Sequence, residues 1–127
     1  MASVHDHIDS IGRFEGFLTF LKNDGNHPDW AVVVVFYIAV HYSRALLSHE
    51  NVLVTSHRSA EASFYHAFRD RACYRHLEVL KKESEKARYD NIRFTWPEVD
   101  RLVNRRLDPF KACAQVLAAA RGLSLPA

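Results

Sequence analysis

Residues that are typical of turns are scarce in this chain. Its 127 residues include only four glycines and four prolines, whereas 48% are hydrophobic and 25% are charged. This is the usage of an ordinary globular chain, and the shortage of turn residues favours helices. No internal repeat, low-complexity tract or linker divides the sequence. We therefore expect a single domain over residues 1–127.

Cysteine and long apolar runs are also scarce. The two cysteines, Cys73 and Cys113, follow no signal-peptide pattern and are predicted to be buried, reduced thiols rather than a disulfide. The uncharged run Trp30–Val40 is shorter than a membrane-spanning segment, and His41 and Arg44 interrupt its extension. These features predict a soluble, cytoplasmic protein with no membrane partner.

The sequence lacks the motifs of several enzyme classes. It contains no glycine-rich phosphate-binding loop and no nucleophile elbow. Its eight histidines form no metal-site spacing with cysteines or carboxylates, so neither a metal nor a cofactor is expected. The net charge of +2 is not that of a dedicated nucleic-acid binder, although 12 arginines against 5 lysines suit contacts with phosphate.

The apolar residues that are present recur mainly with the period of a helix. Residues 3–22 carry them at intervals of three and four, and a cluster of breakers occupies residues 23–28. Asp29 is predicted to cap the next helix. The four valines at 32–35 favour a strand, but the segment runs for about 20 residues without a breaker, which is too long for a usual strand. We therefore predict a helix over residues 29–48.

Two further helical segments follow. Residues 57–89 are helical in pattern with a break near Asp70, and Thr55 or Ser56 is placed to cap them. The residues Thr95-Trp96-Pro97-Glu98 fit the capping box of a last helix, in which Pro109 should cause a kink or break near residue 108 and Gly122 should mark the end. Four main helices and a short extra one, joined by short loops, predict an all-α, antiparallel up-and-down four-helix bundle.

A polar stripe follows the apolar run of the second predicted helix. Tyr37, His41, Arg44 and Ser48 are spaced by four, three and four residues, which places them on one helical face. The stripe is a candidate phosphate-binding cleft or dimer interface. The alternative is a buried histidine whose hydrogen bonds are satisfied by a neighbouring tyrosine or carboxylate.

Several motifs occur in an order that resembles one family. An aromatic-rich second helix, FYIAVHYSRALL, is followed by Ser56-His57-Arg58, by Tyr74, Leu77 and Leu80, by Ala87-Arg88-Tyr89-Asp90, and by a final amphipathic helix. Over residues 8–120 this order resembles the HEPN domain family (higher eukaryotes and prokaryotes nucleotide-binding). The resemblance implies an antiparallel four-helix bundle that often dimerises. It also implies functions in RNA cleavage, in toxin–antitoxin pairs with nucleotidyltransferases, and in RNA or nucleotide binding.

The ribonucleases of that family use an arginine followed, after four to six residues, by a histidine. The pairs with this spacing here are Arg44–His49, Arg69–His76 and Arg71–His76. In such a pair the histidine accepts the 2′-hydroxyl proton and the arginine stabilises the charge on the phosphate, without a metal. The resemblance therefore makes Arg69, Arg71 and His76 the candidate catalytic residues.

Two functions remain open at this point. With 12 arginines and 8 histidines, pairs at this spacing also arise by chance, and the family's active members place theirs nearer the last helix. We therefore expect a non-catalytic, homodimeric module that binds RNA, a nucleotide or a partner protein. The alternative is a metal-independent ribonuclease toxin with a nucleotidyltransferase-type antitoxin as its partner. The candidate binding residues are Tyr37, His41, Arg44, His57, Arg58, Arg88 and Tyr89.

Overall fold

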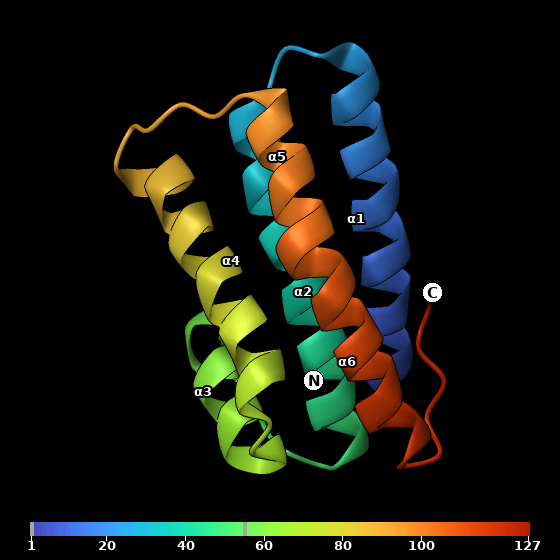
Figure 1. The fold of residues 1–127 in the computed structure, drawn as a ribbon. Helices are drawn as coiled ribbons and strands as arrows, with labels where there is room; N and C mark the ends of the chain where they lie inside the picture. The colour runs from blue at the N-terminus through green and yellow to red at the C-terminus, as the bar shows by residue number, and fades with distance from the viewer. Residues whose placement is uncertain (1, 55) are drawn as a thin grey trace.

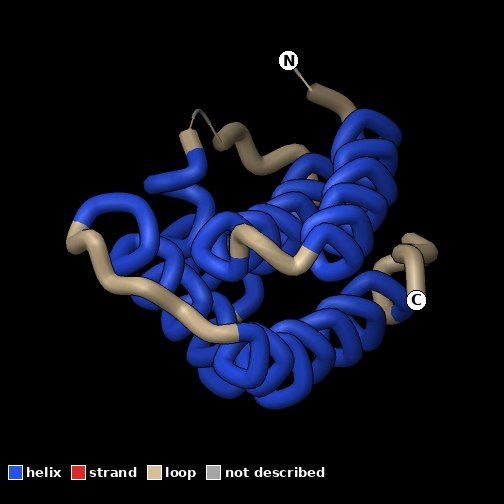
Figure 2. Tube along the Cα trace, turned by 90° about the horizontal axis from the view of Figure 1, so that it is seen from above, coloured by secondary structure: helices blue, strands red, loops and turns tan. Residues whose placement is uncertain are grey.

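The fold is all-helical, as predicted. The computed structural model describes residues 2–54 and 56–127, except for the side chains of residues 57 and 58, and this part of the chain contains no strand (Figure 2). The elements in chain order are α1 (Val4–Asp24), α2 (Pro28–His49), α3 (His57–Phe68), α4 (Arg71–Tyr89), α5 (Trp96–Leu102), the π-helix η1 (Val103–Leu107) and α6 (Asp108–Ala119) (Figure 1).

Helix α2 forms the centre of the molecule. It packs against each of the other helices and supplies most of the core residues between Ala31 and Leu47. The valines at 32–35 are all buried within it. Their side chains meet neighbouring helices on every side, and these contacts outweigh the preference of β-branched residues for strands. The prediction of a helix rather than a strand is confirmed.

The same helix is long enough to cross a bilayer. Its 22 residues are apolar enough for such a span, whereas the uncharged run Trp30–Val40 alone is too short. However, 78% of an apolar stretch of 18 residues within α2 is buried by the rest of the chain. This is the environment of a core helix.

The start of α2 differs from the prediction. The helix begins at Pro28, and its N-cap, His27, makes no capping hydrogen bond through its side chain. The prediction that Asp29 caps the helix was therefore wrong. The Asp29 carboxylate instead accepts a hydrogen bond from the backbone N–H of Phe94, in the loop before α5. The carboxylate links the first turn of α2 to a residue that is distant in sequence.

The break near Asp70 is confirmed. Helix α3 starts after Ser56, whose hydroxyl accepts the N–H of Ser59, whereas Thr55 lies outside the described residues. Arg69 follows α3 with a φ of 54°, a left-handed conformation that interrupts the helix. The Asp70 side chain then accepts the N–H of Cys73 at 2.9 Å and begins α4.

The last helical column contains a change of winding. It begins at the predicted capping box, with Thr95 and Glu98 bonded reciprocally. Before Pro109 the winding widens to the π form of η1, in which the N–H of Asp108 reaches the carbonyl of Val103. The proline thus distorts the column where expected, and α6 continues beyond it (Figure 1). Helix α6 ends at Ala119, shortly before the left-handed Gly122.

The two cysteines form a disulfide between α4 and α6. Cys73 and Cys113 are 40 residues apart in sequence, and their Cα atoms are 5.8 Å apart. The prediction of reduced thiols was therefore wrong. It used the absence of a signal peptide, which concerns the redox environment, whereas the packing of α4 against α6 decides whether the two side chains meet.

The C-terminal segment is attached to the core by Tyr42. The hydroxyl of this buried tyrosine donates to the carbonyl of Pro126 at 2.8 Å, and Gln115 donates to the same oxygen at 2.7 Å. Burial, and to a lesser extent the charge of Glu15, raises the pKa of Tyr42 to about 12. Its phenol therefore stays protonated and remains a donor over the ordinary pH range.

Candidate functional site

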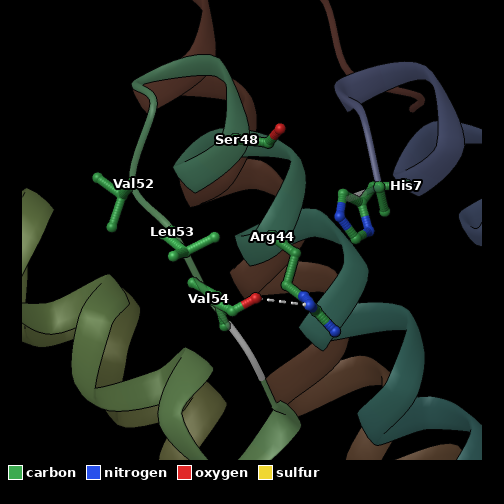
Figure 3. A pocket seen from close by; sticks show the side chains of 7 residues that line it. His7, Arg44, Ser48, Val52, Leu53 and Val54 are labelled. Carbon is green, nitrogen blue, oxygen red and sulfur yellow. Dashed lines mark hydrogen bonds between the residues drawn. The ribbon is translucent and has the colours of Figure 1, made fainter.

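Part of the polar stripe of α2 lines a small pocket. Arg44 and Ser48 face His7 of α1 on one side and the loop residues 52–54 on the other (Figure 3). The pocket has a volume of about 130 Å³. Nη2 of Arg44 donates to the carbonyl oxygen of Val54 at 3.1 Å, which positions the guanidinium beside the loop.

The other half of the stripe packs against α1. Nδ1 of His41 lies 3.0 Å from Nδ1 of His7, and the ring of Phe14 stacks on His41 with a centroid distance of 5.4 Å. Phe14 also contacts the ring of Tyr37. Because one Nδ1 must donate and the other accept, only one of the two atoms carries a proton.

His7 was not identified from the sequence, although a signal was present. It precedes Ile11 by four residues and therefore lies on the buried face of α1, where it is 5% exposed. A neighbouring tyrosine or carboxylate was expected to satisfy the hydrogen bonds of His41, and His7 supplies much of that contact instead.

His76 contacts an arginine other than the two expected. Its Nδ1 lies 3.5 Å from Nη1 of Arg106, which comes from η1. Arg69 is exposed at the end of α3, and Nη2 of Arg71 lies 3.5 Å from the hydroxyl of Tyr65. Residues five apart on a helix point about 140° away from each other, which separates Arg71 from His76. Partial burial, and then the charge of Arg106, lowers the pKa of His76.

A second, larger pocket lies where α4, α5 and η1 meet. Its volume is about 290 Å³, and Arg101 of α5 and Arg105 and Arg106 of η1 line it. Within residues 2–54 and 56–127, none of these three arginines makes an ion pair. The rest of the lining consists of Glu83, Phe94, Glu98 and Leu102.

The carboxylates of the larger pocket already have partners. Oε1 of Glu83 accepts from Lys86 at 3.0 Å, and Oε1 of Glu98 accepts from Thr95 at 3.0 Å in the capping box. Three guanidinium groups line the pocket against two carboxylates, one of which is paired with Lys86, so positive charge is in excess there and favours an anionic ligand. These arginines were not identified from the sequence, because charges at helical spacing resemble a solvated face.

Arg88 and Tyr89 are not among the residues that line either pocket. The guanidinium of Arg88 lies 5.0 Å from the ring centre of Tyr89, at the end of α4, and its Nε donates to the carbonyl of Ser84. Tyr89 is 72% exposed. The side chains of His57 and Arg58 lie outside the described part of the chain.

Comparisons with family models, curated proteins and solved structures find no match. The two pockets are therefore the features of the molecule that bear on its function. Among the described residues, no three His, Cys, Asp or Glu side chains lie together as a potential metal site. The charged groups that can bind a ligand in these pockets are mainly guanidinium groups.

Proposed function

We propose that this chain is a HEPN-like domain that binds RNA or a nucleotide through the larger pocket without cleaving it. Its fold would be an antiparallel up-and-down bundle of α1, α2, α4 and the α5–η1–α6 column, with α3 as the extra helix. We also propose that it is a homodimer, from the resemblance, and that it is cytoplasmic, from the sequence features given above. The observation that carries the functional proposal is that the three arginines of the larger pocket make no ion pair with any described residue.

The chemistry of these side chains suits phosphate. A guanidinium carries five N–H donors in a planar fork that matches two phosphate oxygens. Arg101, Arg105 and Arg106 come from two successive turns of one column and line the same space. That space, about 290 Å³, is close to the lower limit of roughly 300 Å³ for small-molecule pockets. It accommodates the phosphate-bearing part of a nucleotide.

The pocket offers little for reading bases. Phe94, its one aromatic residue, is only 7% exposed and cannot present its face for stacking. Contacts with phosphate fix the position of a nucleic acid but carry no sequence information. We therefore expect single-stranded RNA to bind with little sequence preference and with strong dependence on salt.

The alternative function, a metal-independent ribonuclease, is supported by the pair His76 and Arg106. The lowered pKa keeps His76 neutral near pH 7, so its imidazole can accept a proton from a 2′-hydroxyl. Arg106 would then stabilise the charge on the phosphate, in the role that the sequence assigned to Arg69 or Arg71. Cleavage also needs an acid for the leaving 5′-oxygen, and Glu83 and Glu98 are held by other partners. Binding is therefore the better-supported function.

Binding is tested by fluorescence anisotropy with a labelled single-stranded RNA. The site variant is Arg101→Gln/Arg105→Gln, and the charge-matched control is Arg13→Gln/Arg93→Gln, at exposed positions outside the pocket. The site variant should weaken binding about tenfold or more and lower the slope of log affinity against log salt by about 1.4, which is roughly 0.7 for each phosphate contact with a single strand. Equal losses in both variants, or no binding by the wild type, would contradict the proposal.

Cleavage is tested separately with total RNA in the presence of a metal chelator. Under the binding proposal the wild type leaves the RNA intact. Cleavage that is lost in His76→Ala but kept in His66→Ala, an exposed histidine of α3, would make the ribonuclease the primary function. In that case a nucleotidyltransferase-type antitoxin becomes the partner to seek.

A further inference from the structure

The small pocket contains a cation without a counter-charge. Arg44 is half-buried, and no carboxylate lies within ion-pair distance of it in the part of the chain that the structure describes. One of its five N–H donors serves the Val54 carbonyl. Arginines removed from water are usually paired, because an unpaired charge away from water is unfavourable. The pocket beside Arg44 is thus suited to an anion.

The size of this pocket excludes a nucleotide. Its volume of about 130 Å³ is less than half that of the larger pocket, and well below the roughly 300 Å³ at which small-molecule pockets begin. A ligand enclosed here has only a few heavy atoms. The site uses none of Arg101, Arg105 and Arg106, so its ligand does not depend on RNA binding there.

The composition of the walls distinguishes between small anions. Leu53 and Val54 form an aliphatic side, the side chain of Val52 points away from Arg44, and Arg44 and Ser48 supply the polar groups of α2 (Figure 3). A phosphate dianion needs many donors around four oxygens, and this pocket does not supply them. A carboxylate needs only the two parallel donors of a guanidinium, and a short aliphatic tail suits the apolar side.

We propose that the pocket formed by His7, Arg44, Ser48 and residues 52–54 binds a short-chain aliphatic carboxylate. The guanidinium of Arg44 holds the carboxylate, the Ser48 hydroxyl supplies a second polar group of the wall, and the tail lies against Leu53 and Val54 of the loop. Bound in this way, the ligand joins the loop after α2 to the beginning of α1, where His7 forms the opposite wall.

The test is an NMR titration of the full chain with sodium butyrate, and with sodium chloride and inorganic phosphate as reference anions at matched ionic strength. Butyrate should cause saturable shifts at the amides of residues 52–54 and at the Arg44 Nε–H, with a dissociation constant of the order of millimolar. Phosphate and chloride should not saturate these resonances over the same range. Phosphate acting at equal or lower concentration than butyrate would overturn the assignment.

Two pairs of variants locate the site. Arg44→Gln should weaken butyrate binding about tenfold or more, whereas Arg93→Gln should leave it unchanged. Leu53 is 62% exposed and tolerates substitution, so Leu53→Asp tests the same point without removing the arginine. The new carboxylate should occupy Arg44 and abolish binding, whereas Leu53→Asn should only weaken it several-fold, because this variant removes part of the apolar contact and leaves the guanidinium available to the ligand. Unchanged binding in Leu53→Asp, or shifts confined to residues 101–106, would refute the proposal.

Discussion

Reduction of the disulfide between Cys73 and Cys113 should remove a large part of the stability of this fold. The bond closes a loop of 40 residues, and its loss increases the chain entropy of the unfolded state. The loop-length relation gives roughly 4 kcal/mol of unfolding free energy for this separation. With a urea dependence of about 2 kcal/mol per molar, the unfolding midpoint should fall by roughly 2 M.

The measurement is urea unfolding of the wild type, followed by circular dichroism, with and without a phosphine reductant. Cys73→Ala/Cys113→Ala is the control, and its unfolding midpoint should be the same with and without reductant. Alanine is used because serine at the buried position 73 would add the penalty of a buried hydroxyl. A midpoint that reductant does not move would refute the reasoning. So would two titratable thiols in wild-type protein unfolded without reductant.

Three further outcomes are expected. Arg106→Gln should raise the pKa of His76 toward its ordinary value in an NMR titration, whereas Arg106→Lys should leave it low. Because the pKa of His76 is lowered in the fold, protonation of His76 destabilises the protein as the pH falls below about 6.5. Arg106→Gln should reduce that loss of stability. The pKa of Tyr42 is raised to about 12, so the contribution of Tyr42 to stability is complete below pH 10 and is lost as the pH rises from 10 toward 12. Ultraviolet titration should show that the phenol of Tyr42 ionises late. Tyr42→Phe should remove the part of the alkaline loss of stability that comes from this ionisation. Phe64→Ala should lower the unfolding free energy by about 3–5 kcal/mol because Phe64 is fully buried, whereas Phe20→Ala, at a position 62% exposed, should change it by less than about 1 kcal/mol in the same urea assay.

Local signals made most of the helices predictable. The reciprocal hydrogen bonds of Thr95 and Glu98 span three residues, and the cap at Asp70 spans the same distance. Such contacts depend on sequence spacing alone. The apolar period of α1 and the length of α2 indicated helices for the same reason, although the valine run needed the surrounding helices to settle its conformation.

The errors arose where a distant residue decides the outcome. Asp29 has the chemistry of an N-cap, but the N–H of Phe94 takes its carboxylate. The disulfide joins two helices whose contact no local pattern reveals. The partner of His76 was missed for the same reason, because Arg106 lies 30 residues away from it in sequence. The spacing rule that selected Arg69 and Arg71 considers only neighbours along the chain.

The π-helix η1 has a consequence for chain length. A π turn accommodates one more residue than an α turn at the same place, so η1 behaves as a single-residue insertion in an otherwise α-helical column. Deleting one residue within 103–107 would restore regular winding and leave the direction of all that follows nearly unchanged, because five residues of a π turn cover about the same angle as four residues of an α-helix. Cys113 would then still face Cys73, and Arg101 would keep its direction. The column therefore holds one extra residue without altering the angular phase between its arginine half and its disulfide half.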